Sequence, residues 1–195
     1  MTLRWKPFAL MLLLPVYASA QTTANPGNRS AAPASKLEAF ATRTGAVVIS
    51  GYTVMGGLQG VGQVFVNIRE EREAATPAQA QYGISVEIKD EGPTPGTVTA
   101  YVDEDELDGL IQGVDYISRL PKSVTSMRNF QAVYRTRAEF AVGTFSSALG
   151  EPGFVVQTGR PVIARAFFKQ KDLEPFKALL TQAKQQLAQA RAGAR

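Results

Sequence analysis

The chain has 195 residues, with 21 lysines and arginines against 17 aspartates and glutamates, so its formal net charge is +4. It has no cysteine, which excludes disulfides and a cysteine-linked lipid, and no histidine, which excludes imidazole bases and histidine-ligated metal sites. Any catalysis would depend on carboxylates, lysine, tyrosine or backbone groups. The weak positive charge also argues against a nucleic-acid surface, because such surfaces neutralise many phosphates.

The first twenty residues have the pattern of a secretory signal peptide, 1–20. Arg4 and Lys6 give a positive start, residues 8–16 are apolar but too few to span a bilayer, and Ala-Ser-Ala at 18–20 is typical of a cleavage site. Cleavage would leave a chain that begins at Gln21 and carries a net charge near +2, because both early cations leave with the signal. We therefore expect a periplasmic or secreted protein with no integral membrane segment after cleavage.

Residues 21–35 predict a disordered leader, and residues 36–195 predict a single α+β domain. The leader is small, polar and rich in proline and alanine, so it buries too little apolar surface to offset the entropy of ordering. At the start of the domain, 36–44 favours a short helical turn, because Leu37 and Phe40 are spaced to lie on one side. The remaining length suffices for one hydrophobic core.

The first half of the domain predicts four strands and then a helix. The strands are β-branched or alternate apolar with polar residues, and they span 46–54, 64–70, 82–90 and 96–102. A polar loop over 69–81 separates the second from the third. Asp103 and Glu106 then have the spacing of a capping box, and an amphipathic helix follows as far as Leu120.

The second half repeats this order. Four more strands are predicted, over 129–136, 138–146, 153–158 and 161–168. A final helix has its apolar stripe at Leu173, Phe176, Leu180, Ala183 and Leu187. At an offset of 66 residues the two helix entries correspond, so 46–120 and 128–190 are candidate pseudo-repeats. We predict two ββββα units, with antiparallel sheets packed against two amphipathic helices.

The glycine cluster Gly56, Gly57, Gly60 and Gly62 resembles a phosphate-binding loop in composition. Such loops lead from a strand into a helix, whereas a strand follows here and no Gly-Lys-Ser/Thr occurs. A flexible hairpin connection is the simpler interpretation. The alternative is a loop that binds a ligand or partner, and these glycines are the only binding residues that the sequence suggests.

Two charged segments invite a catalytic or metal-binding interpretation. The acidic residues of 103–108 lack the glycine and terminal glutamate of a calcium loop, and acids at a helix start are expected from the helix dipole. The mixed charges of 69–73 predict a solvated strand end. Two suitably spaced carboxylates would suit a glycosidase-type hydrolase, which stays an alternative.

The order ββββα, ββββα resembles the Whirly/PC4-like fold of single-stranded nucleic-acid binders. In residues the resemblance rests on AYVDEDELDGLIQGV (100–114) and AFFKQKDLEPFKALL (166–180). It implies single-strand binding on a basic, aromatic-lined sheet, whereas the export signal and the near-neutral charge depart from that pattern. The segment DELDGLIQGVDYIS (105–118) is also similar to secreted proteins of unknown function, which implies no activity.

The sequence therefore predicts an exported, soluble, non-catalytic binding or interaction protein. We expect an extracytoplasmic protein or a small ligand as partner, with homo-oligomerisation as a way to cover sheet edges. No catalytic residue, cofactor or metal is predicted. The alternatives are a single-stranded nucleic-acid-binding protein of Whirly-like fold and a carboxylate-based hydrolase.

Overall fold

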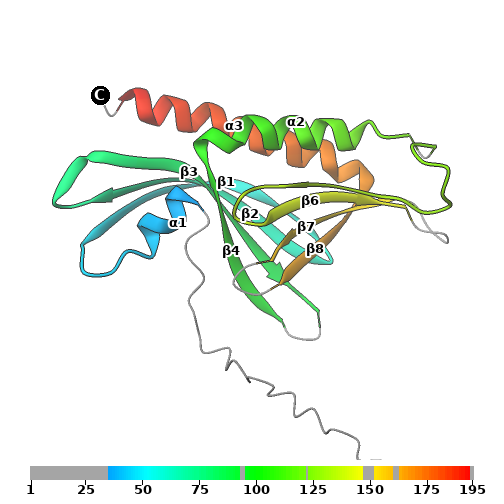
Figure 1. The fold of residues 1–195 in the computed structure, drawn as a ribbon, viewed down its shortest axis with the longest axis horizontal. Coiled ribbons are helices and arrows are strands. Elements are labelled where there is room, and N and C mark those ends of the chain that lie inside the picture. Colours follow the sequence, from blue (N-terminus) through cyan, green and yellow to red (C-terminus); the bar gives the residue numbers. More distant parts are fainter. Residues whose placement is uncertain (1–34, 93–94, 122, 147–151, 160–162, 194–195) are drawn as a thin grey trace, which may run out of the picture. The chain divides into compact units, whose positions relative to one another are not determined.

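The computed structural model describes residues 35–92, 95–121, 123–146, 152–159 and 163–193 (Figure 1). The predicted signal peptide, 1–20, lies outside the described residues, and so does the predicted leader apart from Ser35. That serine begins helix α1 (Lys36–Ala41), because its hydroxyl accepts a hydrogen bond from the Glu38 backbone N–H at 3.0 Å.

The first sheet is antiparallel with strand order β1-β2-β3-β4. Its strands are β1 (Val48–Gly60), β2 (Gly62–Glu73), β3 (Thr76–Asp90) and β4 (Gly96–Asp103). The 3-10 turn η1 (Glu104–Glu106) and helix α2 (Leu107–Ser118) follow. The polar loop predicted over 69–81 is wrong, because β2 and β3 continue through it as a hairpin. Polar side chains there pair within the sheet, as Arg72 does with Glu70 and Tyr82.

The second sheet has the same plan with shorter strands, in the order β5-β6-β7-β8. They are β5 (Gln131–Arg135), β6 (Phe140–Phe145), β7 (Gly153–Thr158) and β8 (Ala164–Lys169). A 3-10 turn, η2 (Gln170–Asp172), leads into helix α3 (Leu173–Gly193). Both 3-10 turns and both helices begin 66 residues apart. The predicted fold class, α+β with two ββββα units, is confirmed; a common origin of the units stays a hypothesis.

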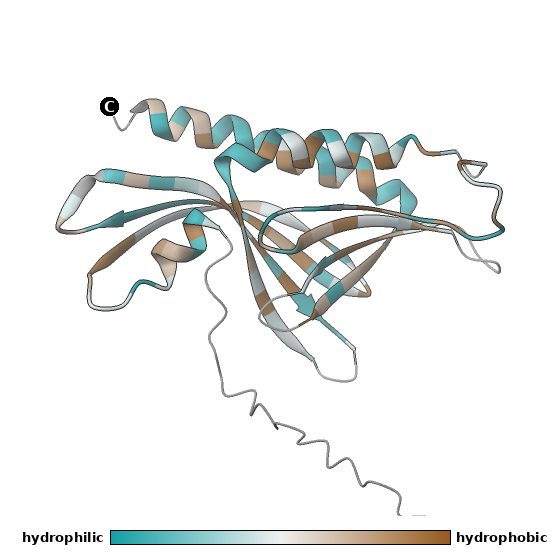
Figure 2. Ribbon diagram, viewed as in Figure 1, coloured by the Kyte–Doolittle hydropathy of each residue, from teal (hydrophilic) through white to brown (hydrophobic). Residues whose placement is uncertain are grey.

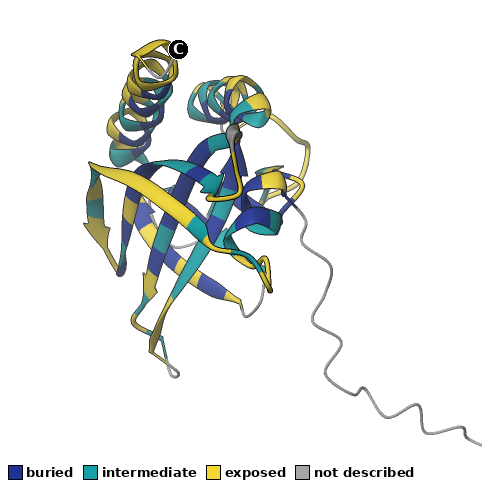
Figure 3. Cartoon of the chain, turned by 90° about the vertical axis from the view of Figure 1, so that its left-hand side faces the viewer, coloured by how far each residue is buried: buried dark blue, intermediate teal, exposed yellow. Residues whose placement is uncertain are grey.

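Each long helix packs mainly on the sheet of the other unit. Helix α3 contacts β1, β2 and β3, helix α2 contacts β5 and β6, and the two helices lie side by side (Figures 1 and 3). The inner faces of both sheets and the apolar stripes of both helices form one buried cluster, which contains Leu110, Val114, Phe176 and Leu180. Apolar residues alternate with polar ones along the strands and helices around that cluster (Figure 2). This exchange of helices couples the two units, because neither sheet buries its inner face with its own helix alone.

The predicted capping box at Asp103 and Glu106 is wrong. Neither residue caps the following helix with its side chain. The Asp103 carboxylate instead accepts the first backbone N–H groups of α1, those of Lys36 and Leu37, each at 2.9 Å. It therefore fixes α1 against the outer face of the first sheet, where Leu37 is fully buried.

Backbone hydrogen bonds join the β1–β2 turn to β8, an outer strand of the second sheet. Val61, at the turn between β1 and β2, exchanges backbone hydrogen bonds with Phe167 of β8, at 2.9 and 2.8 Å. No helix among the described residues is both long enough and apolar enough to span a bilayer.

Candidate functional site

The outer face of the first sheet presents exposed aromatic and apolar side chains. Along β2, Val64, Val66 and Ile68 face the core, so Phe65 and Arg69 face outward by strand alternation. In the cross-strand register Tyr52 lies opposite Arg69. Figure 3 shows the contrast between buried and exposed residues along these strands.

A shallow depression on this outer face is lined by Tyr52, Val54, Phe65, Asn67, Arg69 and Glu87. We call these six residues the Arg69 face. They come from β1, β2 and β3, so the register of three strands places them together. Tyr52 is 66% exposed, Val54 60% and Phe65 41%, which is unusual for apolar side chains that adjoin one another.

Arg69 is held in place by contacts on several sides. Its guanidinium carbon is 5.5 Å from the Tyr52 ring centroid and 5.9 Å from that of Tyr101 on β4. Its Nε donates to the Ser85 hydroxyl at 3.1 Å. Burial raises the pKa of the Tyr101 hydroxyl, and the positive charge of Arg69 opposes that rise. The guanidinium is therefore held in position without any bound partner, and the Tyr52 ring lies on its exposed side.

Glu71 provides the counter-charge and is fully buried. Its carboxylate accepts hydrogen bonds from the Ser50 hydroxyl and, at 3.4 Å, from Arg69 Nη1. The prediction that 69–73 is a solvated strand end is therefore wrong for this residue. A carboxylate that is removed from water needs such hydrogen-bond partners. Here they are Arg69, which belongs to the Arg69 face, and Ser50 on β1.

Carboxylates outnumber guanidinium groups on and beside the Arg69 face. The Arg69 guanidinium pairs with the Glu71 carboxylate, and the Glu87 carboxylate lines the same depression. Glu87 already accepts a hydrogen bond from Asn67 Nδ2 at 2.8 Å. An excess of carboxylates does not attract a nucleic-acid backbone. Within the described residues no three acidic, histidine or cysteine side chains gather closely enough to hold a metal ion.

The structure places the four predicted glycines in strands and at a tight turn. Gly56, Gly57 and Gly60 belong to β1, and Gly62 begins β2 after the single turn residue Val61. A Cβ on Gly60 would lie 2.2 Å from the Phe167 carbonyl oxygen, and Gly62 has a φ of +90°. The predicted hairpin connection is therefore present, and its glycines allow the hairpin to approach β8 closely. Ligand binding by these glycines stays a prediction.

The acidic segment 103–108 forms an ion-pair cluster that joins separate parts of the fold. Asp105 accepts from Lys36 Nζ at 2.8 Å and from Arg137 Nη2 at 2.6 Å. The hydrogen bond from Lys36 and the nearby guanidinium hold the pKa of Asp105 below its ordinary value of 3.8. These acids therefore do more than complement a helix dipole, because they tie α1 and the β5–β6 turn to the end of β4.

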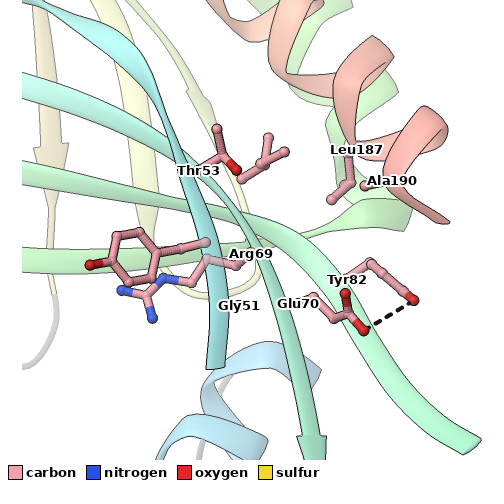
Figure 4. Close-up of a pocket in the computed structure, with 9 residues that line it drawn as sticks. Gly51, Thr53, Arg69, Glu70, Tyr82, Leu187 and Ala190 are labelled. Atoms are coloured by element: carbon pink, nitrogen blue, oxygen red, sulfur yellow. Dashed lines mark hydrogen bonds between the residues drawn. The ribbon is translucent and has the colours of Figure 1, made fainter. Parts of the chain in front are cut away.

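A second hollow lies on the inner side of β1, beside the end of α3. Gly51 and Thr53 line it from the strand, and Leu187 and Ala190 line it from the helix (Figure 4). Glu70 and Tyr82 close one end, with a hydrogen bond between Tyr82 Oη and Glu70 Oε1 at 3.4 Å. The hollow lies beside the edge of the sheet, because β1 is an outer strand.

Sequence reasoning missed the residues of the Arg69 face. The signal was present in the alternation of β2, where Phe65 occupies a position that strand periodicity assigns to the surface. What the sequence could not supply is the register, which brings Tyr52 opposite Arg69 and Phe65 opposite Glu87. Comparison of the chain with protein-family models, with curated proteins and with solved structures finds no match in any of the three.

Proposed function

We propose that this chain is an exported binding protein that recognises a protein partner through the Arg69 face. The observation that carries the proposal is the contiguous exposure of Tyr52, Val54 and Phe65 around a guanidinium held in place. Tyrosine, arginine and phenylalanine are the residues that dominate binding energy in protein interfaces. Export is supported by the signal-like pattern of residues 1–20.

A protein partner fits the shape of the face better than a small ligand does. Small-molecule sites enclose most of the ligand surface in a deep cleft. The Arg69 face is a shallow depression on three strands, with its largest side chains exposed. A shallow surface with exposed aromatic residues and the polar Glu87 beside them has the composition of a protein-binding patch.

The test is cross-linked affinity capture of the mature protein from the extracytoplasmic fraction of its own cells, read by mass spectrometry. Two pairs of variants are compared with the wild type: Phe65→Ala with Phe167→Ala, and Tyr52→Ala with Tyr116→Ala. The pairs are matched, because Phe167 on β8 is 40% exposed and Tyr116 on α2 is 66% exposed. All four side chains lie at the surface, so each variant is expected to fold.

We expect one dominant partner that the wild type, Phe167→Ala and Tyr116→Ala all recover. Phe65→Ala and Tyr52→Ala should weaken its binding by about tenfold or more, as truncation of a central interface residue does. Equal recovery by all four variants would contradict the proposal. A single-stranded oligonucleotide whose affinity falls steeply with salt would instead favour the nucleic-acid alternative.

A further inference from the structure

The outer edge of β1 is free of strand partners over its first half. The strand pairs with β2 on one side from Val48 to Gly60, and on the other side the only backbone pairing in the described structure is that of Val61 with Phe167. A bulge between Val54 and Gly56 interrupts the strand. The regular free edge is therefore Val48–Val54, which is long enough for a full strand pairing.

Before the bulge, this edge lacks the charged residues and prolines that normally prevent strands from adding to it. No charged residue and no proline occurs from Gly45 to Ile68. Natural sheets protect exposed edges with lysine, proline or inward-pointing charges. Ile49 is nevertheless 54% exposed, although it faces the core side of the sheet. An uncharged edge with exposed apolar residues indicates that another strand covers it.

We propose that a second copy of this chain covers this edge, with the two β1 strands antiparallel about a two-fold axis at Gly51. In this register Val48 lies opposite Val54 of the other copy, Ile49 opposite Thr53, and Ser50 opposite Tyr52. Val48 and Val54 are both apolar, Ile49 and Thr53 are both β-branched, Ser50 and Tyr52 both carry a hydroxyl group, and the two glycines meet at the axis. An axis at Tyr52 would instead place the polar Ser50 opposite the apolar Val54, and Ile49 opposite Met55, where the bulge ends the regular edge. Self-complementarity of this kind is what a two-fold interface requires.

The hollow on the inner side of β1 would accommodate a side chain of the second copy. Opposite residues of an antiparallel pair project from the same face, so Ile49 of the second copy would project beside Thr53. There it meets the hollow that Thr53, Leu187 and Ala190 line (Figure 4). The exposed isoleucine would therefore meet the apolar Leu187 and Ala190 of the hollow, and the two-fold axis generates this contact twice.

Pairing would also join the two outer faces. A two-fold axis normal to the sheet keeps both outer faces on one side, so two Arg69 faces would form one surface with the two copies of Tyr52 near its centre. This inference goes beyond the proposed function and does not depend on it, since Ile49 and Gly51 lie outside the Arg69 face. A dimer that binds no partner protein would support this inference alone. A monomer that binds a partner protein would support the proposed function alone.

Analytical ultracentrifugation and cysteine cross-linking test the proposal on the purified protein. Ile49→Lys should raise the dissociation constant of the dimer by about a hundredfold, because the axis brings the lysine into the interface twice. Ile163→Lys, at an exposed position away from this edge, should leave the dimer intact. Because the chain has no cysteine, Gly51→Cys should form a disulfide-linked dimer under mild oxidation, whereas Tyr116→Cys should not.

A wild-type protein that stays monomeric at every concentration would overturn the proposal. So would a dimer that Ile49→Lys leaves unchanged. Failure of Gly51→Cys to cross-link within a dimer that Ile49→Lys does disrupt would overturn the register, and the axis would then lie elsewhere along β1. Circular dichroism of Ile49→Lys ensures that loss of the dimer is not loss of the fold.

Discussion

The two ββββα units have the same order of elements, but the strands of the first unit are longer than those of the second. Strands β1 to β3 have 13, 12 and 15 residues, whereas β5 to β8 have five or six each. The equivalent helix positions, such as Leu110 and Phe176, are equally buried in one core. The comparison separates two tasks. Core positions shared by the units maintain the fold, and the longer strands of the first unit present the Arg69 face and the free edge.

The largest effect should come from the shared core. Leu110→Ala and Phe176→Ala each remove a fully buried side chain at equivalent positions, and we expect losses of about 2–5 kcal/mol in the free energy of unfolding. Since each helix packs on the sheet of the other unit, both variants should keep a single cooperative transition in urea. Two transitions, with each variant shifting a different one, would show that the units fold separately.

An intermediate effect should come from the contact between α2 and β5. A Cβ on Gly113 would lie 2.3 Å from Cδ2 of Tyr134, so Gly113→Ala should destabilise the protein by about 1–3 kcal/mol. It should do so even though alanine favours helices by about 1 kcal/mol over glycine. The measurement is urea unfolding of Gly113→Ala, Tyr134→Ala and the double variant. Additive losses would contradict direct packing, because a clash with the ring should vanish when the ring is removed.

The smallest effect concerns the ion-pair cluster at Asp105. Its pKa is lowered in the folded state by Lys36 and Arg137, so its contribution to stability is present above the unfolded pKa and is lost as the pH falls through the folded pKa. Asp105→Asn should therefore be less stable than the wild type at about pH 7, and the difference should vanish toward about pH 2. Urea unfolding at several pH values measures this. A difference that grows in acid would contradict the assignment.

The fold was largely predictable from the sequence, and the candidate face was not. Period-two and helical patterns predicted the eight strands and both long helices, since each pattern is local. Asp103 shows the limit: its spacing to Glu106 fitted a capping box, but its carboxylate binds the start of α1, 66 and 67 residues away in sequence. Glu71 shows the same limit, because its burial depends on the strands that pair with β2. The Whirly-like resemblance stays a hypothesis, as do the signal peptide and the leader.

The most direct test of the central claim maps contacts made by the outer face in living cells. A photoreactive phenylalanine analogue is placed at position 65 or, as the matched control, at position 167, and the cross-linked products are identified by mass spectrometry. The account predicts that position 65 cross-links to an extracytoplasmic protein other than this chain itself, and that position 167 does not. The same partner cross-linked from position 167 alone would contradict it, because the binding surface would then lie on the second sheet.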